Sequence, residues 1–135
     1  ENPKMGAAWI GQGALAFSAS RLPEAEQMIR KGLELEPEVR GGRYNLARVL
    51  EARGRLAEAE SLDRAEIYSF GDHGKARFNL AQLERQRGNL PGYLTELRLS
   101  TEKAPDFGAS FFFLAREELN AGRLAVAQAA LKAVS

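Results

Sequence analysis

The side chains in this sequence that are best suited to chemistry are amides that recur at a fixed spacing. Asn45 and Asn79 lie 34 residues apart. An asparagine side chain carries both a hydrogen-bond donor and an acceptor, so it can hold a backbone amide of a bound peptide without reading the peptide's sequence. The alternative is that the two asparagines only belong to a repeated structural pattern.

Cations lie in the same segments as these asparagines. Arg48, Lys75, Arg85 and Arg116 would give a shared surface a mildly basic character. Such a surface favours acidic ligands or a C-terminal carboxylate, which arginine can bind through two parallel hydrogen bonds. The alternative is a solvated charged helix face without a ligand.

Three consecutive phenylalanines, Phe111, Phe112 and Phe113, form the strongest apolar cluster. We expect Phe111 in the core. Neighbours on a helix differ by about 100° in direction, so Phe112 and Phe113 cannot both point inward. One of them is either an exposed anchor for a ligand or is buried against the neighbouring unit.

Residues for catalysis or for metal binding are absent from the pattern. His73 is the single histidine and lies in a turn, where a solvated side chain is expected. There is no cysteine, no ligand set with metal spacing, and no phosphate-binding loop, because Gly41 and Gly42 are not followed by Lys and Ser or Thr. The sequence predicts no enzyme activity, no cofactor and no metal site.

Composition limits the kinds of partner. The net charge of +1 provides no overall field toward nucleic acid or an anionic membrane. No apolar run approaches the ~18 residues of a membrane span, so we expect no membrane insertion. The expected protein is soluble, and its sequence does not distinguish a cytoplasmic from a periplasmic location. Because the chain starts at Glu1 without Met, we expect it to be a fragment of a longer protein.

The sequence repeats with a period of 34 residues, and this period predicts the helices that position these side chains. The stretch from Tyr44 to Ala47 recurs from Phe78 to Ala81, and Gly54 recurs at Gly88 and Gly122. A fixed period of this length indicates stacked supersecondary units. Apolar spacing predicts helices at residues 6–19, 23–36, 40–53, 56–69, 75–87 and 91–103, followed by one around 111–119 and another at 124–134.

The inner positions of these helices follow from the same spacing. In units two and three they include Leu46, Ala47, Leu50, Ala59, Leu80, Ala81, Leu83, Tyr93 and Leu97, and in unit four Leu114, Ala115, Ala127, Ala130, Leu131 and Val134. Asp63 and the nearby Glu66 stand where unit one has Ile29 and Gly32, so the second helix of unit two departs from the pattern. Gly13 predicts a close helix approach, because it has no Cβ.

This pattern resembles the tetratricopeptide repeat (TPR), a 34-residue helix–turn–helix unit. The matching residues are Trp9, Gly13, Ala25, Ile29, Gly32 and Pro37; Leu46, Ala47, Gly54 and Ala59; Leu80, Ala81, Gly88, Leu97 and Pro105; and Phe111, Leu114, Ala115, Gly122, Ala127 and Leu131. Departures are Gln12, Arg43, Asp63, Tyr93 and Gly71. A Sel1-type repeat is the alternative, but its units are longer.

The resemblance implies an all-α fold, an α-α superhelix (TPR solenoid) of eight antiparallel helices in four helix-turn-helix units. The expected units are residues 6–39, 40–73, 74–107 and 108–135, the last one truncated without a capping helix. Residues 1–5, with Asn2 and Pro3, would be the tail of a preceding repeat.

The resemblance further implies that the first helices line a concave groove, which binds an extended peptide or a helix of a partner protein. The expected groove residues are Tyr44, Asn45, Arg48, Lys75, Phe78, Asn79, Gln82, Arg85, Phe112 and Arg116, with Ala7, Ile10, Gly11, Ala14 and Phe17 at the matching exposed positions of unit one. In TPR proteins a ladder of asparagines holds the peptide backbone. The two-carboxylate clamp of chaperone-binding repeats is matched only at Asn45 and Lys75, so we do not predict a chaperone-tail binder.

The expected function is therefore a protein–protein interaction scaffold that binds another protein or peptide, with acidic ligands favoured. Two alternatives stay open. The repeats could form a non-catalytic arm of a larger enzyme, or a self-assembly module that forms homo-oligomers through its apolar terminal helices. The uncharged first helix and the alanine-rich last helix support self-assembly, because a terminal repeat normally has a polar outer face.

Overall fold

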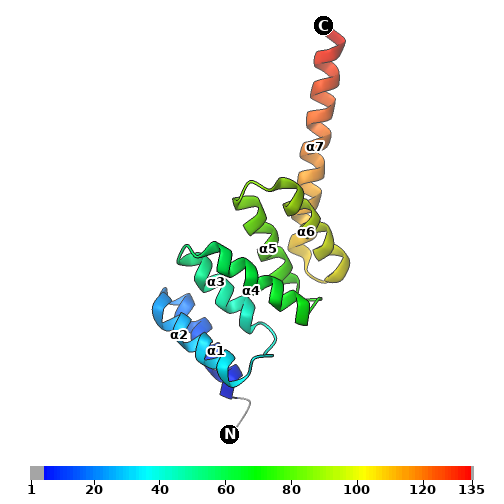
Figure 1. The fold of residues 1–135 in the computed structure, drawn as a ribbon. Helices are drawn as coiled ribbons and strands as arrows, with labels where there is room; N and C mark the ends of the chain where they lie inside the picture. Colours follow the sequence, from blue (N-terminus) through cyan, green and yellow to red (C-terminus); the bar gives the residue numbers. More distant parts are fainter. Residues whose placement is uncertain (1–4, 135) are drawn as a thin grey trace.

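The computed structural model describes residues 5–134, and side chains through residue 133. The described residues form seven α-helices and no strand (Figure 1). Asn2 and Pro3, predicted as the tail of an earlier unit, and the side chain of Val134 lie outside the described part. The helices are α1 (Met5–Ser18), α2 (Leu22–Leu35), α3 (Gly42–Ala52), α4 (Leu56–Ser69), α5 (Gly74–Gln86), α6 (Leu90–Lys103) and α7 (Gly108–Val134).

Glycines in the left-handed region close two of the turns between paired helices. Gly54 has φ of 81° between α3 and α4, and Gly88 has φ of 78° between α5 and α6. The amide that follows each glycine donates back to the last helical turn, from Arg55 to the carbonyl of Leu50 (2.8 Å) and from Asn89 to that of Glu84 (2.9 Å). These bonds satisfy free helix-end carbonyls and reverse the chain.

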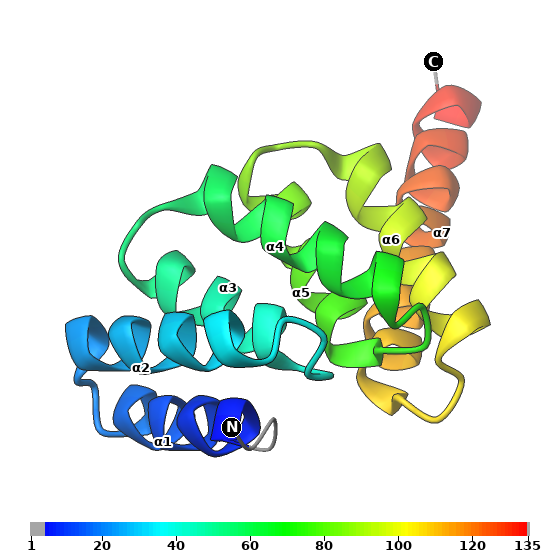
Figure 2. The ribbon, with the colours of Figure 1, turned by 60° about the horizontal axis from the view of Figure 1, so that its bottom comes forward.

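Successive helices pack as antiparallel pairs, α1 with α2, α3 with α4, and α5 with α6, and each pair stacks on the next (Figures 1 and 2). The two helices of a pair approach each other closely where the sequence has a small residue. A Cβ built on Gly13 would lie 2.4 Å from Cγ1 of Ile29. The predicted close approach at Gly13 is confirmed.

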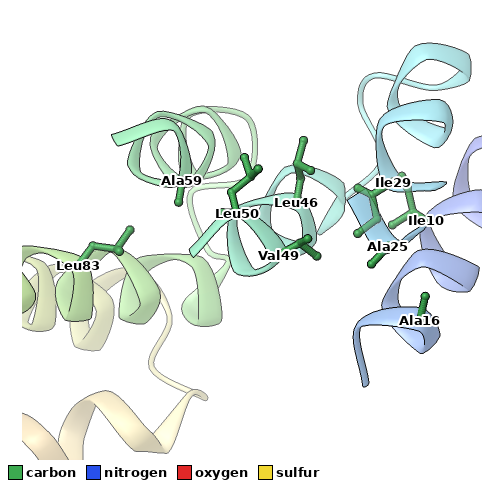
Figure 3. Close-up of a cluster of buried hydrophobic side chains, with 10 residues drawn as sticks. Ile10, Ala16, Ala25, Ile29, Leu46, Val49, Leu50, Ala59 and Leu83 are labelled. Atoms are coloured by element: carbon green, nitrogen blue, oxygen red, sulfur yellow. The ribbon is translucent and has the colours of Figure 1, made fainter. Parts of the chain in front are cut away.

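The core lies between these helices and has two parts. The larger part joins α1 to α4, with Ile10 of α1, Ala25 and Ile29 of α2, Leu46 and Leu50 of α3, and Ala59 of α4 (Figure 3). The smaller part joins α5 and α6 through Ala81, Tyr93 and Leu97. Most inner positions predicted for units two and three are buried, and Leu62, Ala65 and Leu94 are half-buried. The inward position expected for Tyr68 is wrong, because Tyr68, in the last turn of α4, is 93% exposed.

The last unit differs from the prediction of eight helices. Residues 108–134 form one uninterrupted helix of 27 residues, where a turn at Gly122 was expected. Unlike Gly54 and Gly88, Gly122 does not have positive φ. The alanine-rich sequence around it favours helix and offsets the glycine, which costs about 1 kcal/mol in helix propensity. The distal half of α7 therefore extends beyond the other helices (Figure 1).

Candidate functional site

The predicted site residues lie on the first helix of each pair. Equivalent residues recur at the same position of successive first helices. Side-chain contacts link α1 to α3 and α5 to α7, and Tyr44 of α3 contacts His73, the residue that precedes α5. We call the predicted site residues the first-helix surface, defined by Tyr44, Asn45 and Arg48 of α3, by Lys75, Phe78, Asn79, Gln82 and Arg85 of α5, and by Phe112 and Arg116 of α7.

Arg48 joins α1 to α3 on this surface. Its guanidinium carbon lies 5.2 Å from the ring centre of Phe17 and 5.9 Å from that of Tyr44. Nη1 donates to the Tyr44 hydroxyl at 3.4 Å. The rings hold an exposed cation by cation–π attraction, which limits the freedom it would lose on binding a ligand.

Ile10 is not on this surface, contrary to the expectation for unit one. It is 5% exposed and packs between pairs, because its side chain reaches toward Gly32 and Gly42, where a Cβ would lie 2.6 Å and 3.0 Å from it. Two glycines open the space that an isoleucine fills.

An aromatic cluster joins α5 to α7. The ring of Phe78 lies 5.2 Å from that of Phe113 and 5.7 Å from that of Phe107. Phe112 meets Phe113 edge to face at 5.3 Å and is 64% exposed, so Phe112 is the exposed member of the predicted pair. Arg116 lies 4.5 Å above the Phe113 ring.

Phe111 was predicted in the core, and this prediction is wrong. It is 46% exposed. The reason is the straight course of α7: no second helix folds back over its proximal half to cover the side chain.

Both asparagines are oriented by hydrogen bonds within the chain. Nδ2 of Asn79 donates to Oδ2 of Asp63 at 2.7 Å, and Nδ2 of Asn45 donates to the carbonyl of Gly41 at 2.8 Å. Each amide is half-buried. One N–H of each side chain is thus engaged, while each Oδ1 has no hydrogen-bond partner in the described part of the chain. These oxygens are acceptors for a ligand's N–H.

Beneath the asparagines lie two fully buried carboxyl groups, at the positions where the sequence left the repeat pattern. Burial raises the pKa of Asp63 to about 8, and the neighbouring Glu51 and Glu66 also raise it, whereas the Asn79 hydrogen bond and Arg48 lower it. Asp63 is therefore mostly protonated at neutral pH. Glu66 accepts from the Gly41 amide at 2.7 Å, at the N-terminus of α3, where a carboxylate is favoured.

His73 was expected to be a solvated loop side chain, and it is half-buried instead. Its Nδ1 accepts from the amide of Ala76 at 3.1 Å and so caps α5. Its ring lies 5.1 Å from that of Tyr44, and Nε2 is 3.8 Å from Oε2 of Glu66. Burial lowers the pKa of His73, so the neutral ring predominates at pH 7. Sequence reasoning missed this cap, because histidine is not among the residues, Ser, Thr, Asp, Asn and Gly, that usually mark the start of a helix.

The cations of this surface differ from those of the second helices. Arg48, Lys75 and Arg85 have no carboxylate within 4 Å among the described residues. By contrast, Glu26 of α2 pairs with Arg30 of the same helix and with Arg53 and Arg55 of the turn after α3, and Glu60 of α4 pairs with Arg64 of the same helix and with Arg87 of the turn after α5. Arg48 and Arg85 contact aromatic rings instead of carboxylates.

Residues 5–134 offer neither a metal-binding cluster nor a membrane-spanning helix. No group of three or more histidine, cysteine, aspartate or glutamate side chains in this part could hold a metal ion. No helix in the same part has the length and apolar content needed to cross a membrane.

Comparison with known proteins gives structural likeness only. No family model matches the sequence, and no curated protein matches it. Among solved structures, the first TPR of Spaghetti (RPAP3), bound to the HSP90 peptide SRMEEVD, is 16% identical with a TM-score of 0.77, over 90% of this chain and 96% of that one.

Two further solved structures are similar as well. SycD, a type III secretion translocator chaperone of Yersinia enterocolitica, is 14% identical, with a TM-score of 0.76 over 85% of this chain and 91% of its own. PcrH in complex with the chaperone binding region of PopB is 15% identical, with a TM-score of 0.74 over 86% and 94%. The chain has the fold of a TPR domain.

Proposed function

We propose that the protein is a non-catalytic interaction module that binds an extended peptide, or a helix, of a partner protein on its first-helix surface. The observation that carries the proposal is the coincidence of two features there. Oriented amides offer free acceptors at Asn45 and Asn79, and the unpaired cations Arg48, Lys75 and Arg85 lie on the same helices.

The amides suit a peptide backbone. Asn45 and Asn79 occupy the same position of consecutive first helices, and each is fixed by its own internal bond. An amide that is already oriented loses little entropy when a ligand binds. Gln82, one helical turn after Asn79, adds a longer amide to the same row. Backbone contacts of this kind hold a chain while leaving its sequence free.

The charges and rings would select the peptide. Glu51 of α3 holds the position equivalent to Arg85 of α5 and adds one negative charge to the first-helix surface. Arg48, Lys75 and Arg85 add three positive charges, so the net charge of these residues is positive. An acidic segment or a C-terminal carboxylate is favoured. Phe112, exposed at the α7 end, would accept an apolar side chain of that segment.

Support from similar folds is indirect but consistent with the proposal. The RPAP3 and PcrH structures contain bound partner segments. We also propose that residues 6–39, 40–73 and 74–107 act as repeat units of one binding surface, with residues 108–135 as a fourth. A second candidate function, self-assembly through the terminal helices, is favoured by one observation, the exposed distal half of α7.

The test is fluorescence anisotropy with a labelled set of acidic, neutral and basic ten-residue peptides, each with a free or an amidated C-terminus. The expected result is binding of acidic members only. Combining Asn45→Ala with Asn79→Ala should weaken it at least about tenfold, equal to about 1.4 kcal/mol. Gln27→Ala, on the exposed side of α2, is the control. Circular dichroism checks that helicity is kept, and unchanged affinity in the double variant would place the ligand elsewhere.

A further inference from the structure

His73 occupies a position that is apolar at the other junctions between units. One period before it in the sequence is Val39, and one period after it is Phe107. The ring of Phe107 packs against that of Phe78 at 5.7 Å, and the ring of His73 packs in the same way against Tyr44, one period before Phe78, at 5.1 Å. The junction between units two and three thus repeats a ring contact with a side chain that can gain a proton.

The neutral ring of His73 holds the first turn of α5. Its Nδ1 accepts from the amide of Ala76 at 3.1 Å, so the ring hydrogen is on Nε2. Nε2 lies 3.8 Å from Oε2 of Glu66, too far for a hydrogen bond. The other oxygen, Oε1 of Glu66, is buried without a hydrogen-bond partner in the described part of the chain. His73 therefore lies between two partners and bonds only one of them.

A second proton on the ring removes the cap of α5. Protonation places a hydrogen on Nδ1, and an N–H group cannot accept from the amide of Ala76. The charged ring gains a partner in Glu66, which it reaches when the 3.8 Å gap closes by about 1 Å. Asp63, the other buried carboxyl group of α4, has its pKa raised to about 8 and is uncharged in acid. The two protonation states of His73 thus favour two positions of its ring.

Charged side chains around His73 set the pH at which it gains this proton. They come from α4, from the turn before α3 and from α5, namely Glu66, Arg40 and Lys75, and Asp72 precedes His73 in the chain. Burial is the main cause that lowers the pKa of His73 below 6.5; Arg40 and Lys75 lower it further, whereas Glu66 raises it. The ring is therefore neutral at pH 7 and gains its proton in acidic solution.

Both contacts of the neutral ring support the first-helix surface. Lys75 lies between His73 and the capped amide in the first turn of α5, and Tyr44, which contacts the ring, accepts a hydrogen bond from Arg48. A ring that moves toward Glu66 withdraws support from both places. Because Glu66 balances the added charge inside the protein, the surface gains little attraction for an acidic peptide.

We propose that His73 is a proton switch beneath the first-helix surface. The neutral ring caps α5 and supports peptide binding, and the protonated ring pairs with Glu66 and weakens peptide binding. The effect on the peptide rests on the proposed function, whereas the exchange of partners by His73 takes place in the free protein. Two experiments therefore test the two parts separately.

NMR of the free protein tests the exchange of partners. His73 is the only histidine in the sequence, so ring resonances of a tag-free chain report its protonation directly. The backbone amide of Ala76 should titrate with the same midpoint, and its hydrogen-exchange protection factor should fall about fivefold below that midpoint, as expected for a lost cap. Glu66→Gln should move the midpoint to lower pH, because Glu66 raises the pKa of His73. An Ala76 amide that does not follow the ring, or an unchanged midpoint in Glu66→Gln, would overturn the proposal.

Fluorescence anisotropy tests the effect on the ligand. A labelled acidic ten-residue peptide is titrated between pH 5 and pH 7.5 into wild type and into His73→Asn, which keeps a capping oxygen and cannot gain a proton. Comparison of the two proteins cancels the titration of the peptide's own carboxyl groups. Relative to His73→Asn, wild type should lose about fivefold in affinity as pH falls through the His73 midpoint.

The possible outcomes separate this proposal from the proposed function. An affinity ratio that is independent of pH, or a wild type that binds more tightly in acid, would overturn the link between His73 and the peptide. Absence of binding by both proteins at every pH would contradict the proposed function itself, and the NMR titration of the free protein would still decide whether His73 exchanges partners.

Discussion

Asp63 offers the sharpest test of the interior beneath the first-helix surface. The carboxyl group is fully buried, and Oδ1 has no hydrogen-bond partner in the described part of the chain, while Oδ2 accepts from Asn79. Burial raises its pKa from 3.8 to about 8. We predict that Asp63→Asn, which keeps the shape and removes the ionisation, stabilises the protein increasingly as pH rises.

The sign follows from proton linkage. Between pH 4 and pH 8 the folded protein holds a proton on Asp63 that the unfolded chain has released. Stability from this group is therefore fully present below pH 3.8 and is lost as pH rises to about 8. Each pH unit in that window costs up to about 1.4 kcal/mol, so the span from pH 5 to pH 7 costs about 2–3 kcal/mol.

The assay is urea unfolding followed by circular dichroism at pH 5, 6, 7 and 8. The difference in free energy of unfolding between Asp63→Asn and wild type should grow by about 2–3 kcal/mol between pH 5 and pH 7. Ser61→Ala, exposed on the same helix, should give a difference independent of pH. A constant difference for Asp63→Asn would refute the reasoning, because it would mean that Asp63 ionises alike in both states.

Two further predictions concern the scaffold. His73→Ala should lower the free energy of unfolding by about 1 kcal/mol through loss of the α5 cap, and His73→Asn should restore most of it; equal losses in both would show that the cap bond is unimportant. Gly13→Ala should cost about 1–3 kcal/mol in thermal unfolding, because its Cβ would overlap Ile29, whereas Gly11→Ala, with open space around it, should not destabilise; similar effects at both positions would contradict the close packing.

Much of the fold was predictable because one 34-residue period carries the same information several times. Helices α1 to α6 begin and end within two residues of the prediction, and most apolar positions that repeat between α2 and α6 are buried. Where a local feature competes with the period, prediction failed. Gly122 repeats Gly54 and Gly88 in position, yet the alanines around it sustain the helix, and this exposes Phe111.

The site was less predictable, since its geometry depends on contacts between units. The sequence marked Asp63 and Glu66 as departures, but only the fold shows that they orient Asn79 and bind the Gly41 amide. Ile10 follows the same spacing as Tyr44 and Phe78, and two glycines on other helices bury it. Contacts of this kind form between residues of different helices, so the spacing of residues within one helix cannot predict them.

The most direct measurement of the central claim is a two-dimensional ¹⁵N–¹H NMR titration with an acidic peptide selected by the anisotropy assay. Peptide binding on the first-helix surface predicts the largest shifts at the side-chain amides of Asn45 and Asn79 and at the backbone amides of α3 and α5. Shifts confined to α2, α4 or the distal half of α7, with both asparagine amides unmoved, would contradict the account.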